Sequence, residues 1–297
     1  MNYKRIIKNF KNFCRIKNLL NNSISPLIIC KFVECQVSSR STVNSVLNIF
    51  SALKFYSKLL KLDDSVWKDR NLLWYVKGVK SSLPLAIKKK QVISPKMFKK
   101  LCLSLESEGS NGLALKCACI LGYFGMLRVS NVAPSTTRKF NKTENTLKRD
   151  VRVFNSGVSI RLKWSKSRKN CTPIFVNLPK ISDEVVDPVS NFVNYFKGNK
   201  FICKNKPVLL FSDGVHMSRC YISRIFKLHM KQLFPCSNFT FHDLRRSSAT
   251  NVFKYGGSSL AIAKQGTWKS LVYLDYIICN SSKNCQLQTQ FEKMFIR

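Results

Sequence analysis

Residues 147–178 alternate apolar and polar side chains, and this pattern limits the folds that the chain can adopt. A period of two is typical of a half-buried strand. The pattern occurs in three runs, Val151–Phe154, Val158–Leu162 and Pro173–Leu178. Asn155-Ser156-Gly157 is suited to a tight first turn, and Lys163–Asn170 to a longer, basic second turn. The sequence therefore predicts a three-stranded antiparallel sheet.

Elsewhere the apolar residues recur at spacings of three and four, which is typical of helices. Ser41 or Thr42 is placed to cap a helix that runs to Leu60, and Ser94-Pro95 to begin another. Further helices are expected over Trp67–Val79, over Leu113–Leu127 with Arg128 at its end, and from near His242 to the Gly256-Gly257 pair. We therefore expect a mainly α fold with one small antiparallel sheet, an α+β class.

Changes in composition divide the chain into four parts. Residues 1–24 are basic and rich in asparagine, as expected of a flexible arm or of a helix that orders on binding. Residues 25–82 are expected to form a small all-α domain. Residues 83–95 hold two prolines and a run of three lysines, so they are expected to form a basic linker. Residues 96–297 form the second, larger domain.

The excess of positive charge indicates the class of partner. There are 51 lysines and arginines against 15 acidic residues, a formal net charge of +36 at pH 7. A compact fold with this excess repels itself unless a polyanion shares the charge. Double-stranded DNA is the partner that we expect, and an anionic membrane surface is the main alternative. No apolar run approaches the roughly 20 residues of a membrane-spanning helix, so no membrane insertion is expected.

The 12 cysteines do not follow a metal-binding or disulfide pattern. The closest pair, Cys117 and Cys119, lies in an apolar helical stretch, and no CxxC motif occurs. With only three histidines, a zinc site has few further ligands. Met1–Arg5 leads into a basic stretch and not into a secretory leader. We therefore expect reduced thiols, no metal, no cofactor and no secretion, in a nuclear or cytoplasmic protein.

Residue types suited to phosphate chemistry occur close together near the end of the chain. His242-Asp243-Leu244-Arg245 places an imidazole and a guanidinium on one face of the expected helix. A guanidinium matches phosphate oxygens, and an imidazole can transfer a proton. Trp268 carries an indole N–H donor. Tyr276 carries a phenol, a weak nucleophile at a reference pKa of about 10 that needs a neighbouring base or cation.

These motifs, in this order, resemble those of the tyrosine recombinase (phage integrase) family. The closest resemblance is to the recombinases of DIRS-type, Ngaro and Crypton mobile elements. It covers nearly the whole chain and implies an all-α core-binding domain that contacts DNA, a basic linker, and a mainly helical catalytic domain. The ordered set of arginine, lysine, HxxR, tryptophan and tyrosine carries the resemblance.

The resemblance implies a role for each cationic or basic site residue. Arg128, in the sequence Leu127-Arg128-Val129-Ser130-Asn131, and Arg245 would bind the nonbridging oxygens of the scissile phosphate. His242 would share the role of base and also contact that phosphate. Lys166, in the turn between two strands, would protonate the leaving 5′-hydroxyl. Lys163 and Lys169 are the alternatives to Lys166, because the length of this turn varies between members of the family.

The remaining site residues follow from the resemblance in the same way. Trp268 stands where many members have histidine and some have tryptophan. Tyr276 takes the position of the nucleophile, with Tyr273 as the alternative. The implied product is a 3′-phosphotyrosine link to DNA, whose religation needs neither ATP nor a metal.

The expected activity is that of a site-specific DNA recombinase or integrase of a mobile element, acting as a dimer or tetramer on DNA. Residues 280–297 are a natural segment to dock on a neighbouring subunit. Two alternatives stay open: a catalytically silent or domesticated DNA-binding descendant, and an enzyme resembling a type IB topoisomerase.

Overall fold

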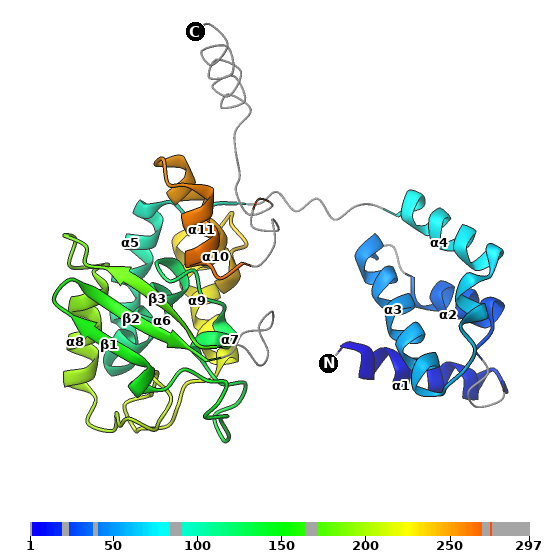
Figure 1. The fold of residues 1–297 in the computed structure, drawn as a ribbon, viewed down its shortest axis with the longest axis horizontal. Helices are drawn as coiled ribbons and strands as arrows, with labels where there is room; N and C mark the ends of the chain where they lie inside the picture. Colours follow the sequence, from blue (N-terminus) through cyan, green and yellow to red (C-terminus); the bar gives the residue numbers. More distant parts are fainter. Residues whose placement is uncertain are drawn as a thin grey trace, which may run out of the picture. The chain divides into compact units, whose positions relative to one another are not determined.

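The structure is a computed structural model that describes residues 2–19, 24–37, 41–83, 91–163, 172–268 and 274. The chain forms two compact units, Met1–Lys89 and Lys90–Arg297 (Figure 1). The boundary falls within the basic linker expected over residues 83–95. Among the described residues, no helix is both long enough and apolar enough to cross a bilayer.

The N-terminal unit is helical wherever it has regular structure in the described residues. Its elements are α1 Asn2–Ile16, α2 Pro26–Gln36, α3 Val43–Leu59, the 3₁₀ helix η1 Asp64–Lys68, and α4 Arg70–Ser82. Thr42 caps α3 as predicted, since its hydroxyl accepts from the Ser45 amide. The helix predicted from Trp67 instead begins at Arg70, because the Asp69 carboxylate accepts a 2.8 Å hydrogen bond from the Leu72 amide and caps α4 there.

Helix α1 belongs to the core of this unit. Ile6, Phe10 and Cys14 are buried at every fourth position, and Phe10 meets the ring of Phe32 edge-on at 5.1 Å. The sequence analysis set residues 1–24 apart as an arm or an ordering helix. In the structure, residues 2–16 instead pack with the other helices through this apolar stripe.

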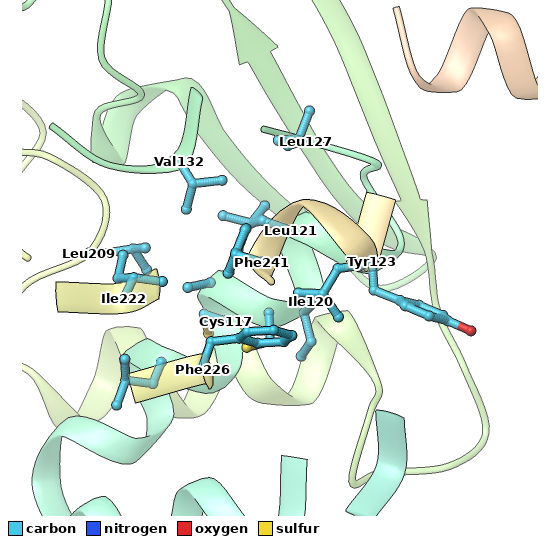
Figure 2. Close-up of a cluster of buried hydrophobic side chains, with 14 of the residues drawn as sticks. Cys117, Ile120, Leu121, Tyr123, Leu127, Val132, Leu209, Ile222, Phe226 and Phe241 are labelled. Atoms are coloured by element: carbon cyan, nitrogen blue, oxygen red, sulfur yellow. The ribbon is translucent and has the colours of Figure 1, made fainter. Parts of the chain in front are cut away.

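The C-terminal unit surrounds one central helix. The helical elements of this unit are α5 Pro95–Ser104, η2 Leu105–Asn111, α6 Gly112–Tyr123, α7 Val129–Val132, η3 Lys148–Asp150, α8 Pro188–Gly198, α9 Arg219–Leu233, α10 Phe241–Lys254 and α11 Ser259–Gln265. Every residue of α6 except Leu113 is buried. Its apolar side chains pack against Phe226 of α9 and Phe241 of α10 (Figure 2). A helix whose side chains are apolar on nearly every face must lie in a core.

The sheet matches the prediction from residue alternation. Its strands are β1 Val151–Phe154, β2 Gly157–Leu162 and β3 Ile174–Pro179, all antiparallel in the order β1-β2-β3. Val151 pairs with Ile160, and Ile160 pairs with Val176, so these three apolar residues lie side by side on the buried face. The mainly α fold with one small sheet is therefore confirmed.

The chain after α6 differs from the prediction that one helix reaches Leu127. Helix α6 ends at Tyr123, and Met126 adopts a left-handed conformation with φ of 47°. The chain therefore leaves the helix before Leu127, and Arg128 is the residue that precedes α7 and not the end of α6. Helix α10 ends as predicted, with Gly256 at φ of 88° after Lys254.

Candidate active site

Arg245 lies inside the C-terminal unit, with only 1% of its surface exposed. Its Nη1 donates to the carbonyl oxygen of Met126, and its Nη2 donates to that of Gly266 at 2.6 Å. A buried guanidinium is costly unless its N–H groups are hydrogen-bonded. These two carbonyls accept from two of its N–H groups and fix the plane of the group from two separate loops.

Trp268 covers one face of the same guanidinium. The Arg245 Cζ atom lies 3.9 Å from the centroid of the indole ring, which is a cation–π contact. Gly266 makes this stacking sterically feasible, because a Cβ there would overlap the indole ring. The backbone of Trp268 is also held, since its amide donates to the Ala263 carbonyl of α11 at 2.9 Å.

Arg128 stands at the start of α7, two residues after the carbonyl that accepts from Arg245. Its Nη1 atom is buried and has no hydrogen-bond partner among the described residues. A buried N–H donor without an acceptor costs about 1–3 kcal/mol. An anion bound at this position would supply the acceptor, so the arrangement suits a phosphate oxygen.

His242 lies close enough to both arginines for their charges to affect its pKa. It lies in the first turn of α10, one turn before Arg245 on the same face. Partial burial lowers the pKa of His242, and the positive charges of Arg245, Arg128 and Arg246 lower it further, against an opposing effect of Asp243. The side chain reaches solvent, but the surrounding protein and the nearby cations still favour the neutral form of the ring. At neutral pH the imidazole can therefore accept a proton.

Asp243 and Arg246, between and beside these residues, have structural roles. Asp243 accepts from the Thr240 amide at 2.7 Å and from its hydroxyl at 2.9 Å, which caps α10. Its other oxygen lies 2.5 Å from Arg246, whose Nη2 also donates to the Gln91 carbonyl at 3.1 Å. Arg246 thus ties α10 to the first described residues of the C-terminal unit.

Of the three candidate lysines, the structure describes Lys163. Its Nζ lies 2.6 Å from Asp150 Oδ2 and donates to the Lys142 carbonyl at 2.7 Å. The Asp150 side chain is 1% exposed, so Lys163 neutralises a buried carboxylate at the end of β2. This contact gives Lys163 a structural partner, and its assignment as an alternative general acid stays a prediction. Lys166 and Lys169 lie outside the described residues.

The structure therefore brings together four of the six predicted site residues, Arg128, His242, Arg245 and Trp268. The two tyrosines, Tyr276 and Tyr273, lie outside the described part of the chain, as do residues 280–297. Within the described residues, no group of three or more His, Cys, Asp or Glu side chains is placed to hold a metal ion.

The sequence analysis missed the groups that hold these residues. The Met126 carbonyl had no sequence signal, because a left-handed methionine is not predictable from local pattern. Gln265 was also missed. Gly266 did carry a signal, since a glycine two residues before an aromatic side chain can mark a close approach.

No protein-family model matches this sequence, and no curated protein matches it. Several solved structures do resemble it. The Tn1549 transposon integrase in complex with transposon right end DNA matches with a TM-score of 0.62 and 13% identity, over 98% of this chain and 93% of that chain. The XerH site-specific recombinase bound to palindromic difH substrate matches with a TM-score of 0.60 and 12% identity, over 97% and 77%.

A lambda integrase tetramer bound to a Holliday junction also matches, with a TM-score of 0.58 and 16% identity, over 93% of this chain and 70% of that chain. At these identities the likeness establishes the fold, which is that of the tyrosine recombinases and integrases. It does not distinguish the DIRS, Ngaro and Crypton subgroup, which stays a prediction.

Proposed function

We propose that this protein is a site-specific DNA recombinase, which cuts and rejoins DNA strands through a 3′-phosphotyrosine intermediate. The observation that carries the proposal is the pairing of two differently held arginines around one neutral histidine. Arg245 is fixed by carbonyl groups and an indole ring, while Arg128 has a buried N–H with no acceptor among the described residues. This combination suits the trigonal bipyramidal phosphorus of a phosphodiester transesterification.

The two guanidinium groups would act on the nonbridging oxygens, where negative charge increases in the transition state. Donors aimed in advance at such oxygens contribute about 3–4 kcal/mol each. His242 in its neutral form would accept the phenolic proton, and the nearby cations would favour the phenolate.

Tyr276 is proposed as the nucleophile, with Tyr273 as the alternative. Its oxygen forms a bond to phosphorus as the bond from phosphorus to the 5′-oxygen breaks. Lys166, with Lys163 and Lys169 as the alternatives, is proposed to supply the proton that the departing 5′-hydroxyl requires. A new 5′-hydroxyl reverses these steps, so the phosphodiester is conserved without ATP.

Double-stranded DNA is the proposed partner because a net charge of +36 favours binding to a polyanion. We also propose that the protein acts as a dimer or tetramer on two DNA sites and serves the integration or excision of a mobile element. Residues 280–297 are the proposed docking segment between subunits. The nucleus, or the cytoplasm of a prokaryote, is the proposed compartment.

A suicide substrate tests the proposal, because a nick beside the scissile bond lets the cleaved fragment diffuse away and traps the adduct. Two sets of nicked duplexes are screened, one of random sequence and one taken from the DNA that flanks the element. A covalent protein–DNA adduct appears as a band that resists denaturation and is digested by protease. We expect an adduct in the wild type and none in Tyr276→Phe. The matched variant Tyr273→Phe should retain it; the reverse result would make Tyr273 the nucleophile.

The alternatives predict different outcomes. A binding-only descendant would retain salt-sensitive DNA affinity and form no adduct with any substrate. An enzyme of the topoisomerase type would form an adduct and relax supercoiled plasmid without exchanging strands between two sites. Recombinant product from two sites supports the proposed function over both.

A further inference from the structure

Gln265, the last residue of α11, holds together the two chain segments that position Arg245. Its Nε2 donates to the Phe124 carbonyl at 2.9 Å and to the Asn177 carbonyl at 2.9 Å. Both acceptors are carbonyl oxygens, so only the amide nitrogen of glutamine can face them. Each of its two N–H groups is therefore used.

Both acceptors are carbonyl groups at the end of a helix or the edge of a sheet, where regular secondary structure supplies no N–H donor. Phe124 follows the last residue of α6, where the final carbonyls have no intrahelical donor. Asn177 lies on β3, which is an edge strand of the described sheet. One glutamine side chain thus joins the ends of α6 and α11 to the sheet.

These bonds lie directly beside the carbonyl clamp of Arg245. Phe124 is two residues before Met126, which accepts from Arg245 Nη1, and Gln265 immediately precedes Gly266, which accepts from Nη2. A separation of the two segments would pull one carbonyl away from the guanidinium. The indole of Trp268 is carried on the same segment as Gly266, so the stacking would change as well.

We propose that Gln265 is a positioning residue for the reaction: it fixes the distance between the Phe124–Met126 and Gln265–Trp268 segments and so holds Arg245 in its phosphate-binding orientation. This inference rests on the proposed function for its catalytic consequence, and on the described contacts alone for its geometric one. The glutamine touches neither substrate nor reacting atoms.

The main test uses Gln265→Met, which keeps the length of the side chain and removes both donors. Single-turnover cleavage of the suicide substrate at saturating DNA is expected to slow roughly 10- to 100-fold, since a misplacement of about 1 Å can have that effect. The final yield of adduct and the DNA affinity should stay within about twofold of the wild type. A loss of yield at an unchanged rate would indicate only a smaller folded fraction and would contradict the proposal.

Two further variants accompany it. Gln265→Glu keeps length and polarity but turns a carboxylate toward two carbonyls, so it should be at least as slow; it carries the test if the methionine variant fails to fold. Leu260→Met changes a side chain on the same helix that is 78% exposed, and it should cleave at the wild-type rate.

A second readout is independent of cleavage. Arg245 is one of the charges that lower the pKa of His242, so a displaced Arg245 should let that pKa rise. NMR titration of labelled histidine should show His242 titrating at higher pH in Gln265→Met and as in the wild type in Leu260→Met. An unchanged titration and cleavage rate would overturn the inference. If the wild type forms no adduct, the proposed function fails while this titration still tests the geometry.

Discussion

The two arginines of the candidate site are held in opposite ways. Arg245 is buried and donates to two backbone carbonyls under an indole ring, so the folded protein determines its orientation before any ligand arrives. Arg128 precedes a helix of four residues, and its buried Nη1 has no acceptor in the part of the chain that the structure describes. Under the proposed function, the fold preorganises one cation, and the phosphate would supply the missing acceptor of the other.

Replacement of the preorganised cation should have the largest effect. Arg245→Lys keeps the charge but cannot reach both carbonyls in one plane, because an ammonium lacks the planar fork of a guanidinium. Cleavage of the suicide substrate is expected to fall by roughly 10²- to 10³-fold. The melting temperature should also fall, because a buried carbonyl loses its donor. A variant with wild-type stability would show that the carbonyl clamp is not needed for folding and would weaken the contrast with Arg128.

Arg128→Ala is the matching change at the second arginine. It should slow cleavage by roughly 10²-fold through the loss of one phosphate donor. Its melting temperature without DNA should equal or exceed that of the wild type, because the variant removes a buried donor that lacks an acceptor in the described residues. Thermal unfolding with and without DNA separates the two arginines: DNA should stabilise the wild type more than this variant. A large loss of stability in the absence of DNA would contradict the interpretation.

Gly266→Ala should have a smaller effect on the cleavage rate, and it should act only through the environment of Arg245. Its Cβ would overlap the Trp268 ring, so the indole must leave the guanidinium. A cation–π contact away from solvent contributes about 2 kcal/mol, which corresponds to a rate lower by roughly 30-fold if all of it is lost in the transition state. Gly198→Ala is the matched control, because a Cβ there meets no atom within 4 Å. Equal cleavage rates for the two variants would show that Trp268 need not cover Arg245.

The sequence predicted those features of the fold that depend on neighbouring residues in the chain. Strand alternation over residues 151–178 and the Gly256 stop of α10 are local, and the structure has them where expected. The helix before Arg128 was predicted to run to Leu127, but it ends at Tyr123, because the left-handed Met126 depends on packing and not on propensity.

The supporting groups of the site could not be predicted for a similar reason. Met126 and Phe124 contribute backbone carbonyls, which have the same chemistry in every residue, and only the fold determines where they point. Lys163 illustrates the converse limit. Its sequence position allowed a catalytic role, and only the structure shows that its ammonium group pairs with the buried Asp150, 13 residues earlier.

His242 gives the smallest expected effect and joins both arginines. Its pKa in the folded protein is below its ordinary value of 6.5, so the unfolded chain binds a proton more readily. The resulting stability is fully present above pH 6.5 and is lost as the pH falls through the folded pKa. The midpoint of urea unfolding should therefore decline as the pH falls below about 6.5, and His242→Gln should reduce that decline.

The pKa of His242 in two arginine variants compares the arginines directly. Removal of the Arg128 charge in Arg128→Ala should raise this pKa, whereas Arg245→Lys retains a cation and should raise it less. If Arg245→Lys raises it as much as Arg128→Ala does, the position of the charge at residue 245, and not its presence alone, controls the pKa of His242, which would contradict this expectation.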